Sequence, residues 1–171
     1  MSRLLAYAIV TALCLLLPSP VLVSAVAQET SSHSNLPVPR FATIGSTRVH
    51  MRQGPGRDHR ILWVFEDQRG LPVEIIAETE TWRQIRDPDG DEGWVHRSLL
   101  SRSRSVIVLG SRQTLRRSAD PEAPAVAYLN PRVAASVSTC DPNWCEVTVG
   151  RYTGFLRHEG VWGVYPGEVI E

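Results

Sequence analysis

The residues of this 171-residue chain that are best suited to bind a ligand are aromatic and cationic. An indole ring can stack on a sugar or a peptide while its N–H donates a hydrogen bond, so Trp63, Trp82 and Trp94 are candidates. Arg52 and His96 can contact a carboxylate. We predict that these five residues bind ligand, and that Trp82 is partly exposed because it opens a strand after a polar turn. In the alternative, the rings fill the core of a small fold and His96 lies on a solvated face.

Two cysteines, Cys140 and Cys145, flank a four-residue segment that contains Pro142. Proline suits the second position of a turn, so the two thiols should meet across a hairpin and form a disulfide in an oxidising compartment. Because the loop is short, the bond should stabilise the fold by less than the ~3 kcal/mol expected for a 15-residue loop. The alternative is a redox-active pair, but the Cys-x-x-Cys spacing and helix N-terminus that lower a thiol pKa are missing.

No residue pattern predicts a metal centre or a catalytic centre. The histidines fall in no metal-ligating spacing such as His-x-x-x-His. The acidic run from Asp87 lacks the glycine at its sixth place and the glutamate at its twelfth that a calcium-binding hand needs, and Asp89-Gly90 is typical of a hairpin turn. No Gly-x-Ser-x-Gly segment is present. We therefore expect no cofactor, and a binding protein in preference to an enzyme.

Short strands must position these residues. Alternating or continuous apolar residues indicate strands near 49–52, 61–65, 73–77, 82–86 and 93–96, with turn-forming residues between them. No ten-residue segment has a helical period. Short strands with turn signals every 8–12 residues indicate an all-β sandwich or barrel.

The strand pattern occurs twice along the chain. Four anchors recur downstream at offsets of 64, 60, 62 and 61 residues, so the insertions fall in turns. The first set is Met51–Arg52, Gly70–Val73, Trp82–Ile85 and Gly93–Val95. The second set is Leu115–Arg116, Asn130–Val133, Trp144–Val147 and Gly154–Leu156. We infer a duplication, with copy one at residues 41–103 and copy two at residues 104–171.

The N-terminal residues have the features of a secretory signal peptide. Arg3 precedes an apolar run from Leu4 to Leu17, and Ala25-Val26-Ala27 supplies small residues before a cleavage site after Ala27. The run is shorter than the roughly 20 residues of a membrane span, although an uncleaved anchor is the alternative. We expect residues 1–27 to be removed, residues 28–40 to form a polar, Pro-rich leader, and the mature chain to be periplasmic or secreted without a stable membrane span.

The charge is balanced in the whole chain and in each copy. The formal net charge is zero, residues 37–103 carry ten Arg and ten acidic residues, and residues 104–171 carry seven of each. A nucleic-acid-binding domain has a basic excess, so the sequence disfavours a nucleic-acid partner.

Copy one resembles the bacterial SH3-like domain family. The family's first strand and loop correspond to Val49–Pro55, its Gly before the third strand to Gly70, its Trp-x-x-Ile to Trp82–Ile85, and its Gly-Trp-Val to Gly93–Val95. Copy two departs from the pattern, with Ser118–Asp120 in place of Gly-Pro-Gly and Phe155 in place of the tryptophan. Its closing segment Trp162–Glu168, here called the tail, is similar to the tails of a proteobacterial group of exported two-copy proteins.

The resemblance implies two tandem SH3-like small β-barrels of five strands that bind cell-wall peptide or protein, usually without catalysis. The short linker implies that the two copies pack together. We expect a non-catalytic exported protein that recognises peptidoglycan stem peptide or another cell-envelope ligand through copy one. The alternative is an envelope adaptor that docks a partner protein through the tail.

Overall fold

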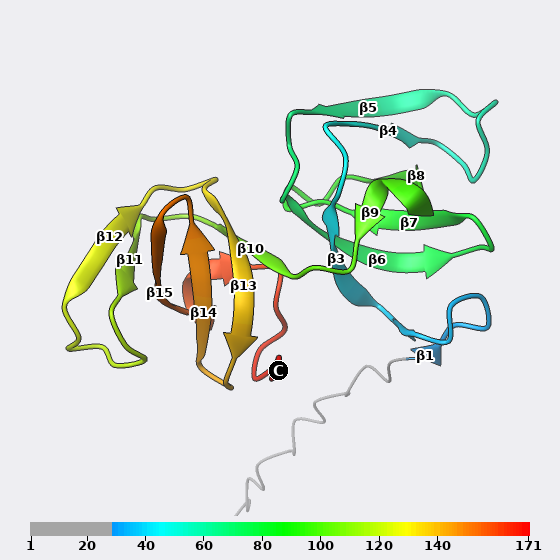
Figure 1. Ribbon diagram of the computed structural model, residues 1–171. Helices are drawn as coiled ribbons and strands as arrows, with labels where there is room; N and C mark the ends of the chain where they lie inside the picture. Colours follow the sequence, from blue (N-terminus) through cyan, green and yellow to red (C-terminus); the bar gives the residue numbers. More distant parts are fainter. Residues whose placement is uncertain (1–28) are drawn as a thin grey trace, which may run out of the picture.

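The computed structural model describes residues 29–171, and in it the chain forms two all-β lobes (Figure 1). The predicted signal peptide lies outside the described residues. Each lobe is built on a seven-stranded antiparallel sheet, and the two sheets have the same order of equivalent strands, as a duplication predicts. Among the described residues, no helix is long and apolar enough to cross a membrane.

The sheet of copy one has the order β5-β4-β8-β7-β6-β3-β9. Its strands are β3 (Arg40–Ile44), β4 (Arg48–Arg52), β5 (Ile61–Glu66), β6 (Pro72–Glu78), β7 (Trp82–Arg86), β8 (Glu92–His96) and β9 (Leu100–Ser101). The five strands expected from the sequence are β4 to β8, and a short 3-10 turn, η1 (Arg97–Leu99), links β8 to β9.

The sheet of copy two has the equivalent order β12-β11-β15-β14-β13-β10-β16. Its strands are β10 (Ser105–Val108), β11 (Gln113–Arg116), β12 (Ala125–Leu129), β13 (Ala134–Cys140), β14 (Trp144–Val149), β15 (Tyr152–Arg157) and β16 (Val161–Trp162). A second 3-10 turn, η2 (His158–Gly160), takes the place of η1.

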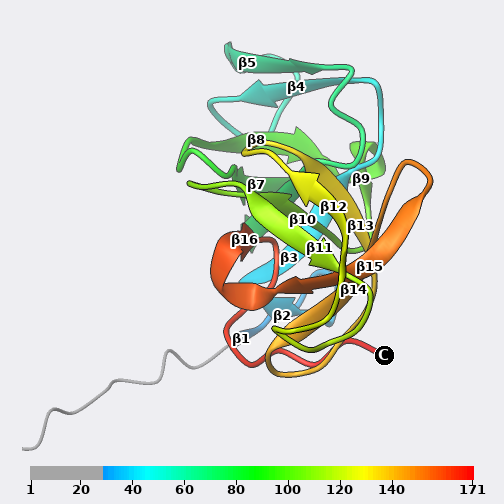
Figure 2. The ribbon, with the colours of Figure 1, turned by 90° about the vertical axis from the view of Figure 1, so that its left-hand side faces the viewer.

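Neither sheet forms the closed five-stranded barrel that the resemblance implied. The hydrogen-bonded order ends at β5 and β9 in copy one and at β12 and β16 in copy two, and within residues 29–171 no pairing joins these ends. The additional strands β3 and β10 lie next to each other in the middle of the molecule in both views (Figure 1, Figure 2). Their sequences do not alternate because both faces are covered: all four residues of β10 and four of the five in β3 are buried.

Each lobe has its own apolar core, built from the inward faces of its strands. Fully buried residues include Val49, Phe65 and Ile85 in copy one, and Leu115 and Val147 in copy two. Alternation along the strands sends these side chains inward and their neighbours outward.

The glycine of the Gly-Trp-Val anchor keeps β8 close to β4. A Cβ on Gly93 would lie 2.9 Å from the carbonyl oxygen of Arg52, and a Cβ on Gly154 would collide with the carbonyl oxygen of Arg116. Only glycine permits so close a backbone approach, which explains why this anchor recurs in both copies.

The two lobes pack through Phe41 of β3. Its ring meets Trp162 edge-on, with the ring centroids 4.9 Å apart, and lies 4.7 Å from the ring of Tyr165. The guanidinium carbon of Arg104 lies 5.8 Å from the Phe41 centroid, and the Tyr165 hydroxyl donates a hydrogen bond of 2.8 Å to Glu74 of β6. The predicted packing of the copies is therefore confirmed, and the tail of copy two provides much of it.

Polar contacts reinforce this interface. Arg132 of copy two donates two hydrogen bonds of 2.8 Å to the carboxylate of Asp89, in the β7–β8 turn of copy one. The hydroxyls of Thr43 and Ser105 lie 2.9 Å apart at the meeting of β3 and β10. Gly163 has a φ of +123°, and a Cβ there would collide with the carbonyl oxygen of Ser105, so the tail can pass this close only at a glycine.

The described part of the polar, Pro-rich leader folds onto copy one. A hairpin of β1 (Glu29–Thr30) and β2 (Pro37–Val38) runs into β3. The side chains of Ser34 and Arg40 both contact the carboxylate of Glu78, Arg40 at 2.7 Å. The attachment consists of polar contacts. A prediction based on the low content of apolar residues in the leader could therefore not detect it.

Candidate ligand-binding site

Four of the five predicted ligand-binding residues lie on the outward face of copy one. The register places Arg52 opposite Trp94, and Trp82 opposite His96, across β4, β8 and β7. The fifth, Trp63, does not join them. It lies on the edge strand β5, paired with the buried Met51, and is 55% exposed.

The face contains a pocket of about 380 Å³, here called the copy-one pocket. Arg52, Trp82 and His96 line it, whereas Trp94 and Trp63 do not. The remaining lining residues are Arg48, His50, Arg57, Ser98 and Leu99. No Asp or Glu of residues 29–171 lines the pocket, so the charged side chains of its lining are arginines, with two histidines beside them.

Trp82 is more buried than predicted. It is only 9% exposed, because its ring meets that of His96 edge-on at a centroid distance of 5.5 Å. The backbone of β7 also fixes it in place, since Trp82 donates its N–H to the Thr79 hydroxyl (3.2 Å) and accepts from the Thr79 N–H (2.9 Å). Trp82 therefore lines the pocket as a largely buried side chain and not as an exposed ring.

The cationic side chains of the pocket are held to different degrees. Arg52 donates from Nη1 to the carbonyl oxygen of His59 at 2.8 Å, which ties the β4–β5 loop to the sheet face. His96 Nδ1 lies 2.7 Å from the Ser98 hydroxyl. Arg48 contacts Glu66 at 3.4 Å with both side chains exposed, an ion pair that contributes little in water. The exposed Arg48 and Arg57 are therefore available to a carboxylate ligand.

Copy two contains an equivalent pocket that the sequence analysis missed. It has a volume of about 270 Å³, and Arg112, Arg116, Trp144 and Arg157 line it where copy one has Arg48, Arg52, Trp82 and His96. Arg157 lies over the Trp144 ring at 5.1 Å. The match of Trp144 to Trp82 was the available signal, but the altered loop at Ser118–Asp120 hid it.

The loop contact of Arg52 is also repeated. Arg116 donates from Nη1 to the carbonyl oxygen of Ala123 at 2.7 Å, at the position that corresponds to Arg52 and His59. Since the same hydrogen bond shapes both loops, Arg52 and Arg116 have a structural role whatever they bind. The two pockets therefore differ in their other lining residues, and not in this arginine-to-loop hydrogen bond.

The predicted disulfide is present at the end of the β13–β14 hairpin. Cys140 and Cys145 are cross-strand partners with Cα atoms 4.1 Å apart. His158 Nε2 lies 3.2 Å from the Cys145 sulfur, so three potential metal ligands gather here. With both sulfurs in a disulfide, however, they are not the thiolates that metal ions bind.

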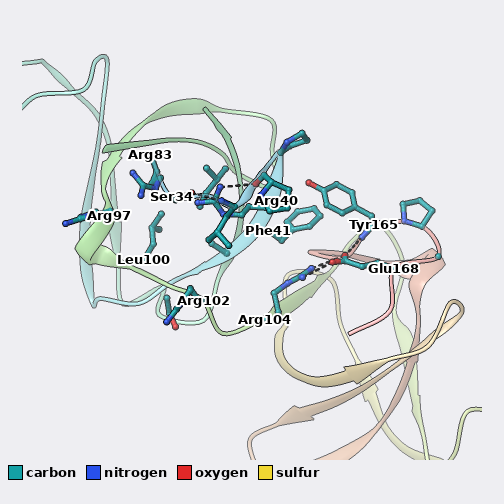
Figure 3. A pocket seen from close by; sticks show the side chains of 18 residues that line it. Ser34, Arg40, Phe41, Arg83, Arg97, Leu100, Arg102, Arg104, Tyr165 and Glu168 are labelled. Carbon is teal, nitrogen blue, oxygen red and sulfur yellow. Dashed lines mark hydrogen bonds and ion pairs between the residues drawn. The ribbon is translucent and has the colours of Figure 1, made fainter. Parts of the chain in front are cut away.

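A larger groove, about 1140 Å³, lies between the leader, copy one and the tail (Figure 3). We call it the arginine groove because five arginines line it: Arg40, Arg83, Arg97, Arg102 and Arg104. Figure 3 shows Tyr165 beside Phe41 at one end of the groove, and Arg83 and Arg97 at the other. The sequence analysis missed this site because its residues come from five separate segments.

Two carboxylates of the chain itself are held at this groove. Burial would raise the pKa of Glu78, but hydrogen bonds from Ser31, Ser34 and Arg40, with the charge of Arg40, outweigh burial and lower it to about 2. Burial likewise opposes ionisation of Glu168, yet hydrogen bonds from Arg104 and the Tyr165 backbone N–H lower its pKa below the usual value. Both groups are therefore charged at neutral pH.

The comparison with known families decides the relationship. The sequence profile of the bacterial SH3 domain matches residues 45–102 and 110–163. The chain belongs to the bacterial SH3 domain family. The two matches fall on the two lobes, in agreement with the resemblance seen in the sequence.

One curated relative is the putative N-acetylmuramoyl-L-alanine amidase YrvJ of Bacillus subtilis (strain 168), which is 28% identical over 132 residues. The match covers 70% of this chain and 25% of the amidase, so the chain spans about a quarter of that relative's length. Similar solved structures include NlpC2 and NlpC1 from Trichomonas vaginalis, 10% and 12% identical with TM-scores of 0.33. These matches cover 73% and 84% of this chain and 48% and 51% of theirs, and likenesses this distant carry no argument.

Proposed function

We propose that the protein is a non-catalytic, exported binding protein that recognises a carboxylate-bearing ligand of the cell envelope, with peptidoglycan stem peptide as the first candidate. The observation that carries the proposal is the copy-one pocket, where the largely buried Trp82 shares the lining with the basic side chains of Arg48, His50, Arg57 and His96 and no carboxylate of the described residues lines the pocket. An aromatic ring with cationic side chains around it suits a peptide that ends in a carboxylate.

Two further observations support this function. The chain belongs to the bacterial SH3 domain family, and the curated relative that it matches is named as an amidase of N-acetylmuramoyl-L-alanine. The shared region is a quarter of that amidase, so the catalytic activity in its name is not transferred to this chain. A role in association with peptidoglycan is the part that the shared region can supply.

The test is co-sedimentation of the purified exported protein with purified sacculi. We expect wild-type protein to be retained, and a variant with Arg48→Gln and Arg57→Gln to lose most of the retention at an unchanged melting temperature, because both side chains are exposed. The matched control, Arg69→Gln with Arg117→Gln, removes two exposed charges that line neither pocket nor groove. Absence of wild-type retention, or equal loss in both double variants, would reject the proposal.

The non-catalytic part of the proposal has a separate test. Purified protein is incubated with soluble muropeptides, and the products are separated by chromatography. Unchanged muropeptides are the expected outcome, whereas turnover that scales with protein concentration would identify an enzyme. The inactive control is a heat-unfolded sample of the same preparation.

A further inference from the structure

The arginine groove combines a cationic rim with apolar walls. Its five arginines stand against two carboxylates, Glu168 in the lining and Glu78 behind it. Between the charges the lining is apolar, and it is formed by Leu36, Pro37, Pro39, Ala42, Ile75 and Leu100. Such a surface suits a ligand that presents acidic and apolar groups together.

Two glutamates of the chain itself show how the arginines of the groove bind carboxylates. Glu78, whose side chain is 1% exposed, accepts a hydrogen bond from Arg40 at 2.7 Å and forms an ion pair with Arg83 at 2.9 Å. Glu168 accepts from both Nη atoms of Arg104, at 2.8 and 3.0 Å (Figure 3). The lowered pKa values of both carboxyl groups show that each arrangement favours the charged form.

Two arginines of the groove are left without such a partner. Arg97 and Arg102 are exposed, and among residues 29–171 neither has a carboxylate within ion-pair distance. They flank Leu100 at the rim (Figure 3). Burial lowers the pKa of Arg83, the charge of Glu78 opposes this, and the nearby charges of Arg40 and Arg97 lower it further. Because Glu78 pairs with both Arg40 and Arg83 while Arg97 and Arg102 have no carboxylate among the described residues, this end of the groove has a surplus of positive charge.

We propose that the arginine groove is a second binding site, separate from the copy-one pocket, and that it takes an extended acidic segment of a partner protein. The carboxylates of the segment pair with Arg97 and Arg102, and its apolar side chains lie against Leu100 and the prolines of the leader. A phosphate polymer has the charge for the rim but no side chains for the apolar walls, and therefore leaves that surface exposed.

The direct test is fluorescence anisotropy with a labelled octapeptide in which glutamate alternates with alanine or leucine. The purified exported protein should bind this probe saturably, and added salt should weaken the binding. The same peptide with glutamine in place of glutamate should not bind, since it cannot form charge-assisted hydrogen bonds. Absence of saturable binding, or equal binding of the glutamine peptide, would overturn the proposal.

Three double variants locate the site. Arg97→Gln with Arg102→Gln should weaken binding by about tenfold, because charged hydrogen bonds are lost at a half-open site. The control pair Arg69→Gln with Arg117→Gln should leave the affinity within about twofold, the size of a screened, distant effect. Equal losses in these two variants would show that the probe reads only overall charge, and would overturn the assignment.

The third variant separates this site from the proposed function. Arg48→Gln with Arg57→Gln should lose retention by sacculi but keep affinity for the acidic peptide. If it loses the peptide instead, the peptide occupies the copy-one pocket and the groove proposal fails. Two results together would overturn the assignment to a partner protein: soluble muropeptides displace the acidic peptide, and the variant with Arg97→Gln and Arg102→Gln loses retention by sacculi. They would show that stem peptide occupies the groove.

Discussion

Copy one and copy two solve the same structural problem with different chemistry. At the end of the β6–β7 hairpin, Glu78 is the cross-strand partner of Arg83, and the two side chains form an ion pair. At the equivalent end of the β13–β14 hairpin, Cys140 is the partner of Cys145, and the two form a disulfide. Both copies thus have a cross-strand link at the same register position, an electrostatic link in copy one and a covalent link in copy two.

The same position also anchors a terminal segment in each copy. Glu78 holds the leader through Ser34 and Arg40. Cys140 holds the C-terminal end through two backbone hydrogen bonds with Ile170, of 2.9 and 3.0 Å. In each copy the residues of the cross-strand link therefore close a hairpin and also hold a terminal segment, the leader in copy one and the C-terminal end in copy two. It follows that the two ends should respond to different conditions, the leader to acid and the C-terminal end to reductant.

The largest expected effect is on the ion pair of copy one. Glu78→Ala leaves Arg83 buried without its carboxylate, and breaking a buried pair costs about 3–5 kcal/mol of unfolding free energy. Denaturant unfolding measures the loss, with Glu80→Ala in the adjacent exposed turn as the control. A loss below about 1 kcal/mol, the range of exposed ion pairs, would show that the pair does not secure this lobe.

Acid should have the next largest effect, and the sign follows from the lowered pKa of Glu78. Because the folded state holds this carboxyl at about 2, against an ordinary value of 4.5, its contribution is complete above pH 4.5 and is lost as the pH falls towards 2. The loss amounts to at most about 3 kcal/mol. Unfolding of wild type and Glu78→Gln across this range gives the difference, and parallel pH profiles would contradict the prediction.

Loss of the disulfide should have a smaller effect. Cys140→Ala with Cys145→Ala should lower the unfolding free energy by about 2 kcal/mol, since the bond closes a very short loop. Hydrogen exchange should speed up at Ile170 while the leader keeps its protection. Equal deprotection of both terminal segments would mean that the two links do not act locally.

We expect the smallest effect on retention by sacculi when one arginine is removed from either pocket. Arg48→Gln in copy one should reduce sacculus retention a few-fold, the range of one exposed charge contact, and Arg112→Gln in copy two should reduce it less. The reason is that copy two has Pro121 and Thr114 where copy one has Arg57 and His50, and its pocket is smaller. A greater loss with Arg112→Gln would make copy two the main binding unit.

The sequence predicted the strands that have one solvated face, and missed those covered on both faces. Alternation identified β4 and β6, whereas β3 and β10 were hidden because nearly all of their residues, on both faces, are buried. The disulfide was predictable because its partners are close along the chain. The ion pair of Glu78 and Arg83 was not, because a bulge between Ile75 and Ala77 shifts the register that pairs them.

The candidate site was predicted only in part, for a related reason. The register brings Arg52, Trp82 and His96, three of the five residues predicted to bind ligand, into one pocket. The exposure of Trp82 was predicted wrongly, because the contact with His96 depends on neighbours in space. The arginine groove was missed altogether, since its lining depends on how the tail returns to copy one.

The return of the tail also bears on how the molecule unfolds. Phe41 belongs to copy one, but the rings that cover it, Trp162 and Tyr165, come from the C-terminal segment of copy two. Neither lobe can open without uncovering the other's apolar surface, so calorimetry should record a single cooperative transition in place of two. Copy one produced alone would expose Phe41 and the outer face of β3, a surface prone to association. We therefore expect the two copies to unfold as one unit.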